Sequence, residues 1–233
     1  MVRKLYWEDA YIREFEATVE RADGDRVYLD STAFHPRGGG LVGDCGTMNG
    51  YMVMDTQKEG ENSIFHTIGG QHNLKPGDSI HGIIDWERRY RIMRMHTTAH
   101  ALSAVFNKEA GALITGNQIR PDESRIDFSL ENLDRERMNS YVEEVNNAIS
   151  KNLPVKTYFL PREVAVKIPD VVKLAGAAPP DIDTFRIVEI EGLDIQADGG
   201  VHVKNLGEIG KVVPLKFENK GKSNRRLYFT LND

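Results

Sequence analysis

The stretch DWERRYRIMRMHTTAHALSAVFNKEAG, residues 85–111, is where the character of the chain changes. Apolar side chains recur within it at intervals of three and four residues, which is the repeat of an amphipathic helix. Asp85 is suited to cap the start of this helix and Gly111 to end it. The apolar stripe consists of Ile92, Met95, Ala99, Leu102 and Phe106. We therefore expect one long helix, with His96 and His100 beside its buried face.

Residues 1–85 have the pattern of a β domain. Short apolar runs alternate with turn-forming residues, at a near-regular spacing that suggests a small barrel or curled sheet. These runs are residues 26–30, 51–54, 63–66 and 80–84. Together with the change at Asp85, they predict an N-terminal β-barrel domain over residues 1–85 and a second domain over residues 86–233.

The part that follows the long helix mixes helix and strand patterns. A second helix is expected from about residue 132 to residue 151, with Met138, Val142, Val145 and Ile149 on its buried face. Strand-like runs occupy residues 125–129, 155–159 and 185–190, and the tail has the pattern of a hairpin formed by residues 211–217 and 226–231. The predicted fold class is α+β, a small N-terminal β-barrel followed by an α+β domain.

Composition narrows the class of protein. With 233 residues, 40% of them hydrophobic, the chain is long enough to bury a substantial core. A net charge of −5 argues against a broadly basic surface, although short basic clusters can still bind RNA locally. The single cysteine, Cys45, excludes an internal disulfide and fits a reducing compartment. We find neither a membrane-spanning run nor the apolar core of a signal peptide, so we expect a cytoplasmic protein without a membrane partner.

Two pairs of residues with a four-residue spacing suggest a metal site. His96 and His100 would share one face of a helix and could converge on one ion. Asp198 and His202 flank two glycines, which allow the backbone to turn closely around an ion or substrate. The alternatives are hydrogen-bonded histidines at a helix edge and an ordinary turn before a strand. No glutamate follows His96, so the general base of a zinc peptidase is missing, as are the paired cysteines of the zinc deaminases.

A second unusual segment carries three successive glycines, Gly38, Gly39 and Gly40. Such a run lets the main chain approach a ligand without side-chain obstruction. A phosphate cradle is one interpretation, but the Lys-Ser/Thr end of a nucleotide-binding loop is absent. A flexible surface turn is the other. The neighbouring Thr32 and His35 could contact a substrate or simply face solvent.

Taken together, these motifs resemble the editing domain of alanyl-tRNA synthetase and, more closely, the free-standing AlaX trans-editing proteins. The resemblance covers nearly the whole chain. It is carried by Phe-x-Pro-x-Gly-Gly-Gly at residues 34–40, by His-x-x-x-His at residues 96–100, and by a Cys-x-x-x-His pattern for which this chain has Asp198 to His202. Residues 85–90, 115–118, 125–128 and 198–203 are also similar. The chain length and the intact glycine-rich barrel are similar to the medium-sized AlaX type.

The resemblance implies a trans-editing hydrolase that deacylates tRNA(Ala) mischarged with serine, or with glycine, without ATP and with one zinc ion per chain. It implies His96, His100 and His202 as zinc ligands, with Asp198 in place of the family's cysteine, either as a ligand or as a group that orients water. Zinc would then activate a water or position the aminoacyl group.

The same resemblance motivates the expected substrate contacts. Thr32 is the leading candidate to hydrogen-bond the serine hydroxyl, followed by Gln118 and Thr115, with Gly38, Gly39 and Gly40 beside them. Thr32, Gln118 and Asp198 are the expected catalytic residues. Phosphate contacts are expected from the basic residues near the long helix and in the terminal hairpin, namely Arg88, Arg89, Arg91, Arg94, Lys216, Lys220, Lys222, Arg225 and Arg226.

Two other functions stay open at this point. One is a metal-dependent hydrolase of a small ester or amide that uses the same histidines without RNA. The other is a non-catalytic RNA-binding barrel in which the histidines are structural. Chelator-sensitive loss of serine, but not alanine, from charged tRNA would separate the editing enzyme from both.

Overall fold

The computed structural model describes residues 1–60, 62–132, 134–169, 171 and 181–232. Its contacts divide the chain into two compact units, Met1–Ile92 and Met93–Asp233. The division falls within one helix, a few residues after the position that the sequence suggested. The domain boundary predicted at residue 85 stays a prediction.

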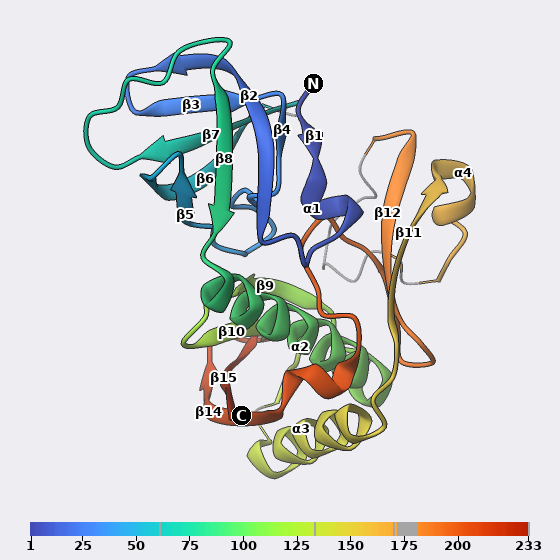
Figure 1. The fold of residues 1–233 in the computed structure, drawn as a ribbon. Helices are drawn as coiled ribbons and strands as arrows, with labels where there is room; N and C mark the ends of the chain where they lie inside the picture. The colour runs from blue at the N-terminus through green and yellow to red at the C-terminus, as the bar shows by residue number, and fades with distance from the viewer. Residues whose placement is uncertain (61, 133, 170, 172–180, 233) are drawn as a thin grey trace. The chain divides into compact units, whose positions relative to one another are not determined.

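The strands of the first unit form a closed barrel in the order β2-β3-β7-β6-β5-β8 (Figure 1). These strands are β2 (Glu14–Asp23), β3 (Arg26–Leu29), β5 (Gly46–Met48), β6 (Tyr51–Glu59), β7 (Ser63–Ile68) and β8 (Ser79–Ile84). Beside the barrel, β1 (Arg3–Lys4) pairs in parallel with β4 (Ser31–Thr32), and the short helix α1 (Leu5–Glu8) follows β1.

Strict alternation explains why β2 belongs to the barrel wall. Phe15, Ala17 and Val19 are buried while the residues between them are exposed, as expected where successive side chains point to opposite faces. Inside the barrel these residues meet Val27 and Ile80 in one hydrophobic cluster. This strand was not predicted from the sequence.

The helix α2 (Trp86–Ala110) begins and ends as the sequence predicts. The Asp85 carboxylate accepts the Arg88 backbone N–H at 3.2 Å, which caps the helix start. Gly111 has a φ of +63° and donates its N–H to the Asn107 carbonyl at 2.7 Å, which ends the helix with a left-handed residue. The predicted apolar stripe is buried along its whole length.

The second unit contains a four-stranded antiparallel sheet in the order β14-β15-β10-β9. Its strands are β9 (Ile114–Gln118), β10 (Ser124–Phe128), β14 (Lys211–Asn219) and β15 (Arg225–Asn232), so the predicted terminal hairpin is confirmed. Phe106 of α2 stacks on Phe128 of β10, with ring centroids 4.1 Å apart. The helix α3 (Arg135–Ser150) packs against the other side of Phe106 through Tyr141, and Asn146 exchanges two hydrogen bonds with Val212 of β14.

A smaller sheet in the order β11-β12-β13 completes this unit. It consists of β11 (Val155–Pro161), β12 (Thr184–Ile190) and β13 (Asp194–Ala197), with the short helix α4 (Arg162–Ala165) after β11 and a 3₁₀ turn, η1 (Leu206–Ile209), before β14. Phe185 and Ile187 bury one face of β12 against Ala165 and Val171.

The predicted mixture of strands and helices is confirmed. The second helix begins at Arg135, where the Asp134 carboxylate accepts the Arg137 N–H at 3.0 Å, rather than at about residue 132. Residue 133, within the expected helix, lies outside the described residues. No helix in the described part of the chain has the length and apolar content needed to cross a membrane, and the expected cytoplasmic location stays a prediction.

Candidate metal centre

Side chains from two distant segments converge in the second unit. His96 and His100 lie one turn apart on α2, and Asp198 and His202 lie in the loop that follows β13. One ligand atom from each of the four residues lies within 4.8 Å of the other three. The three histidines are buried and Asp198 is half-buried. The structure therefore brings together the four residues that the two spacings predicted.

The Asp198 carboxylate lies close to all three imidazoles. His202 Nε2 lies 3.1 Å from Asp198 Oδ1, while His96 Nε2 and His100 Nε2 lie 3.7 and 3.8 Å from Asp198 Oδ2. Ligands of tetrahedral zinc, each about 2.0–2.1 Å from the ion, would be separated by about 3.3 Å. The three separations from the Asp198 carboxylate, one to Oδ1 and two to Oδ2, are close to that value.

Hydrogen bonds fix the orientation of the imidazole rings. His96 Nδ1 lies 3.3 Å from the Val201 carbonyl, and His100 Nδ1 lies 3.1 Å from Asp194 Oδ2. Both partners are acceptors, so Nδ1 carries a proton in each ring and Nε2 is the nitrogen that faces the other donors. A metal-ligating histidine characteristically makes such a bond with its other nitrogen.

Thr97 gives the third ring the same tautomer. Its hydroxyl donates to the Met93 carbonyl at 2.9 Å, so its oxygen can only accept from His202 Nδ1 at 3.1 Å and from the Val203 N–H at 3.2 Å. His202 Nε2 is therefore left with a lone pair that faces Asp198. Thr97 and Asp194 were not identified from the sequence.

Two features shape the loop that carries Asp198. A Cβ atom at Gly200 would lie 2.6 Å from His96 Cε1, closer than real Cβ contacts, so only glycine allows the backbone to pack against this ring. The buried Arg186 donates to the carbonyls of Asp198 and Gly200, both at 3.0 Å. Asp198 Oδ1 also accepts the Gly200 N–H at 2.6 Å, which closes the turn. The close approach expected from the paired glycines occurs at Gly200.

Burial and charge set the protonation of the cluster. Burial lowers the pKa of His96 to about 4 and lowers that of His202 well below its usual range. Burial also disfavours the charged form of His100, but Asp194 and Asp198 outweigh it and raise the pKa of His100 to about 9. Although burial opposes ionisation of Asp198, the imidazoles hold the pKa of its carboxyl well below the usual value. Two neutral imidazoles and a carboxylate, which are metal-binding forms, are thus present at neutral pH.

The glycine-rich segment of the first unit forms a tight hairpin. Gly38 and Leu41 exchange backbone hydrogen bonds of 2.9 and 3.2 Å, and the two residues between them, Gly39 and Gly40, have φ of +60° and +89°. Positive φ at both corner positions is the type I′ turn, which strongly favours glycine. The turn itself therefore accounts for two of the three glycines, and the predicted substrate role of Gly38, Gly39 and Gly40 stays a prediction.

Thr32 is buried in a short hydrogen-bond chain rather than facing solvent. His66 Nδ1 lies 2.9 Å from the Val27 carbonyl, so His66 Nε2 must accept from the Thr32 hydroxyl at 2.9 Å. Thr32 Oγ1 also accepts the Phe34 N–H at 3.1 Å. Burial lowers the pKa of His66 to about 4, which keeps this arrangement at neutral pH. Its predicted contact with the serine hydroxyl is not tested by these bonds.

The other predicted substrate residues lie on β9. The Thr115 hydroxyl donates to Asn224 Oδ1 at 2.9 Å. Gln118 lines a cavity of about 70 Å³ together with Arg125 and Tyr228. Their proposed contacts with substrate stay predictions.

The predicted phosphate contacts require correction. Arg89 is fully buried and ion-pairs with Asp44, so its assignment to RNA binding is wrong. Arg225 is also buried and donates to the Glu131 carbonyl, which makes it structural. Five other residues of this group also make bonds within the chain: Arg88 to the Gly43 carbonyl, Arg94 to the Ile209 carbonyl, Arg226 to Asp127, and Lys216 and Lys220 to Glu218. Contacts of RNA with these five residues, and with Arg91 and Lys222, stay predictions.

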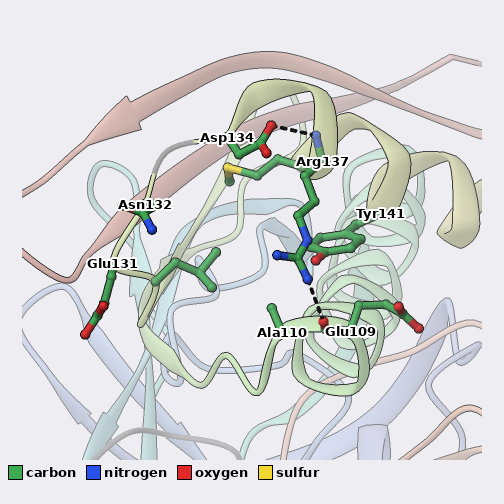
Figure 2. A pocket seen from close by; sticks show the side chains of 9 residues that line it. Glu109, Ala110, Glu131, Asn132, Asp134, Arg137 and Tyr141 are labelled. Atoms are coloured by element: carbon green, nitrogen blue, oxygen red, sulfur yellow. Dashed lines mark hydrogen bonds between the residues drawn. The ribbon is translucent and has the colours of Figure 1, made fainter.

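A cavity of about 510 Å³ lies where the C-terminal end of α2 meets the start of α3 (Figure 2). Arg137 reaches across it and donates to the Glu109 carbonyl at 3.3 Å. The Tyr141 hydroxyl is buried here and has no hydrogen-bond partner among the described residues. No spacing in the sequence indicated this cavity, which contains none of the predicted site residues.

Comparison with known proteins gives independent information. Residues 185–228 match the family model described as the threonyl and alanyl tRNA synthetase second additional domain. The chain is 49% identical to the alanyl-tRNA editing protein AlaX-M of Saccharolobus solfataricus, over 99% of both chains. It is 46% identical to AlaX-M of Methanosarcina barkeri over the full length of both. It is also 35% identical to the alanine–tRNA ligase of Sulfurisphaera tokodaii, over 99% of this chain and 26% of the ligase.

Proposed function

Because the chain belongs to the AlaX-M family of alanyl-tRNA editing proteins, which are aminoacyl-tRNA deacylases, we propose that it hydrolyses the ester of tRNA(Ala) mischarged with serine, and also with glycine, and spares alanine. The single observation that carries the chemistry is the cluster of His96, His100, Asp198 and His202. Among the described residues, this is the set of metal donors that the sequence predicts and the structure brings together.

The need for such an activity follows from the limits of selection by size. A small apolar pocket rejects an amino acid that carries one additional hydroxyl only weakly, so a second site must remove the errors. That second site should have polar groups that serine satisfies and alanine leaves unpaired, because an unpaired buried polar group is costly.

Zinc is the metal that we propose for the cluster, with one ion per chain. A donor set of three imidazoles and one carboxylate suits it, although the carboxylate is a harder ligand than the cysteine of the family pattern and gives less selectivity for zinc. When bound, zinc supplies Lewis acidity toward the ester and its attacking water. His96, His100 and His202 would hold it through Nε2, and Asp194, Thr97 and the Val201 carbonyl keep those atoms turned inward.

We assign Asp198 as the fourth ligand rather than as the general base. Its low pKa makes its carboxylate a weak base at neutral pH, whereas an effective base has a pKa near the working pH. Its Oδ1 is also held by the Gly200 N–H, which restrains the carboxylate beside the imidazoles.

Thr32 is our proposed reader of the serine hydroxyl. Its own proton is donated to His66, and one lone pair of Oγ1 accepts the Phe34 N–H. The remaining lone pair can therefore only accept, which suits a hydroxyl donor and gives nothing to alanine. Thr32→Val should slow hydrolysis of the serine ester and leave the glycine ester unaffected. Thr115, Gln118 and the Gly38–Gly40 hairpin are further proposed contacts.

The test is hydrolysis of tRNA(Ala) charged separately with serine, glycine and alanine, with and without a chelator. We expect chelator-sensitive loss of serine and glycine, persistence of alanine, and loss of activity in His100→Ala. His81→Ala is the control, because His81 lies on the exposed surface of the barrel unit. Equal persistence of all three esters would refute the proposal. Hydrolysis of small esters at a rate that added tRNA does not change would favour a small-ester or amide hydrolase. RNA binding by protein that contains no metal would favour a non-catalytic RNA-binding barrel.

A further inference from the structure

Lys4 and Lys58 of the first unit differ from the other cations around them. Neighbouring arginines are neutralised: Arg3 lies 2.7 Å from Glu8, and Arg37 lies 2.9 Å from Asp55. Among the described residues, neither lysine makes an ion pair or a hydrogen bond. The two charges therefore lack a partner of opposite sign.

The two lysines lie next to features that the sequence singled out. Lys58 Nζ lies 3.5 Å from the position that a Cβ atom would take at Gly38, so its ammonium sits against the glycine hairpin. Lys4 is aligned with Thr32 in the β1–β4 pair, and its Nζ lies 4.0 Å from the Trp7 ring centre. Burial and the nearby Lys58 charge lower the pKa of Lys4.

We propose that Lys4, Lys58 and the Gly38–Gly40 hairpin bind a phosphodiester of the RNA substrate. An anion between two ammonium groups replaces their repulsion with two attractions. Gly39 has no neighbouring atom within 4 Å of its Cβ position, so the hairpin tip leaves space for a nucleotide backbone. The identification of the anion as RNA rests on the proposed function.

The register of Lys4 suggests which phosphodiester is bound. Lys4 lies beside Thr32, the proposed reader of the amino acid. The phosphodiester closest to an aminoacyl ester is the one that joins the terminal nucleotide, which carries the ester on its ribose. We assign the lysine pair to that phosphodiester or to its immediate neighbour at the 3′ end.

The experiment measures binding of an acceptor-stem RNA hairpin with a single-stranded 3′ end, by fluorescence anisotropy over a range of salt concentrations. Each phosphate contact contributes about 0.7–0.9 to the slope of log affinity against log salt. Lys4→Gln/Lys58→Gln removes the contact with one phosphodiester and should therefore lower the slope by about 0.7–0.9. Between 1 M and 0.1 M salt, the affinity of the double variant should then rise about 5- to 8-fold less than that of the wild type. Lys75→Gln, an exposed lysine of the same unit, is the matched control and should change neither value.

A thermal unfolding curve of the double variant keeps the result interpretable. An unchanged slope in a folded double variant overturns the inference, and an equal change in Lys75→Gln overturns it as well, since that would indicate a general effect of charge. Hydrolysis of serine-charged tRNA by the wild type, tested separately, decides the proposed function. If the salt slope is unchanged in the double variant but the wild type hydrolyses serine-charged tRNA, only the lysine site is refuted. If the slope falls as expected but the wild type does not hydrolyse serine-charged tRNA, only the proposed function is refuted.

Discussion

Replacing Arg89 with methionine tests directly whether its buried ion pair with Asp44 stabilises the barrel unit. The Arg89 side chain is fully buried and donates to the Asp44 carboxylate through Nε at 2.8 Å and again through Nη2. It also donates to the Ala10 carbonyl at 3.0 Å and to the Ala33 carbonyl. Asp44 in turn accepts the His35 N–H at the base of the glycine-rich segment. Arg89→Met leaves the length of the side chain but removes all of these bonds.

The expected cost is large because the partner charge stays behind. Removal of one member of a buried ion pair typically costs about 3–5 kcal/mol. A domain is stable by only about 5–15 kcal/mol, so this loss approaches the whole stability of a small unit. Arg89→Met/Asp44→Leu removes both charges and should be less destabilised than Arg89→Met alone, because no unpaired carboxylate is left.

Denaturant titration followed by tryptophan fluorescence suits this measurement. The two tryptophans, Trp7 and Trp86, both belong to the unit Met1–Ile92, so the signal follows that unit. Arg3→Met is the control, because the Arg3–Glu8 pair has a similar separation of 2.7 Å but both side chains are exposed. An exposed pair contributes little, and we expect no measurable change. If Arg89→Met is as harmless as Arg3→Met, the ion pair does not have the role that its burial implies.

Three further predictions concern the metal centre and the buried histidine of the barrel. Asp194→Ala should weaken metal binding about 10- to 100-fold, because it removes the acceptor that orients His100; competition with a coloured chelator measures it, and unchanged affinity would contradict it. Gly200→Ala should displace the His96 ring, whose Cε1 would lie 2.6 Å from the new Cβ, so metal content should fall while tryptophan-monitored unfolding stays unchanged. Burial lowers the pKa of His66 from 6.5 to about 4, so the unfolded chain binds a proton that the folded chain does not. The free energy of unfolding should therefore fall by about 3 kcal/mol between pH 6.5 and pH 4, and His66 should add no pH dependence above pH 6.5. In denaturant titrations at each pH, His66→Gln should lose less of this free energy on acidification than the wild type.

Local patterns account for what could be predicted from the sequence. The caps of α2 and its stripe depend on residues a few positions apart, and so does the convergence of His96 with His100. No local rule joins segments about 100 residues apart. The convergence of α2 with the Asp198 loop could be predicted only because the motifs of this chain occur in the same order as in the AlaX proteins. Asp194 and Thr97 could not be found because their roles arise only once His100 and His202 are in place.

The wrong assignment of Arg89 and the absence of β2 from the predicted strands have physical causes. Arg89 was grouped with its basic neighbours, although it lies three residues before Ile92 and therefore continues the buried stripe of the helix toward its start. Its position on the stripe was the available signal. The strand β2 was not predicted because polar residues alternate with Phe15, Ala17 and Val19, as a barrel wall with one solvent-exposed face requires.

The donor set His96, His100, Asp198 and His202 contains no sulfur. A cysteine ligand at the position of Asp198 would be open to oxidation to sulfenic acid and beyond. The chain's one thiol, Cys45, lies elsewhere, in the barrel unit, where its Sγ donates to the Met54 carbonyl. Peroxide that inactivates a thiolate-ligated centre would therefore find nothing to attack among these four side chains.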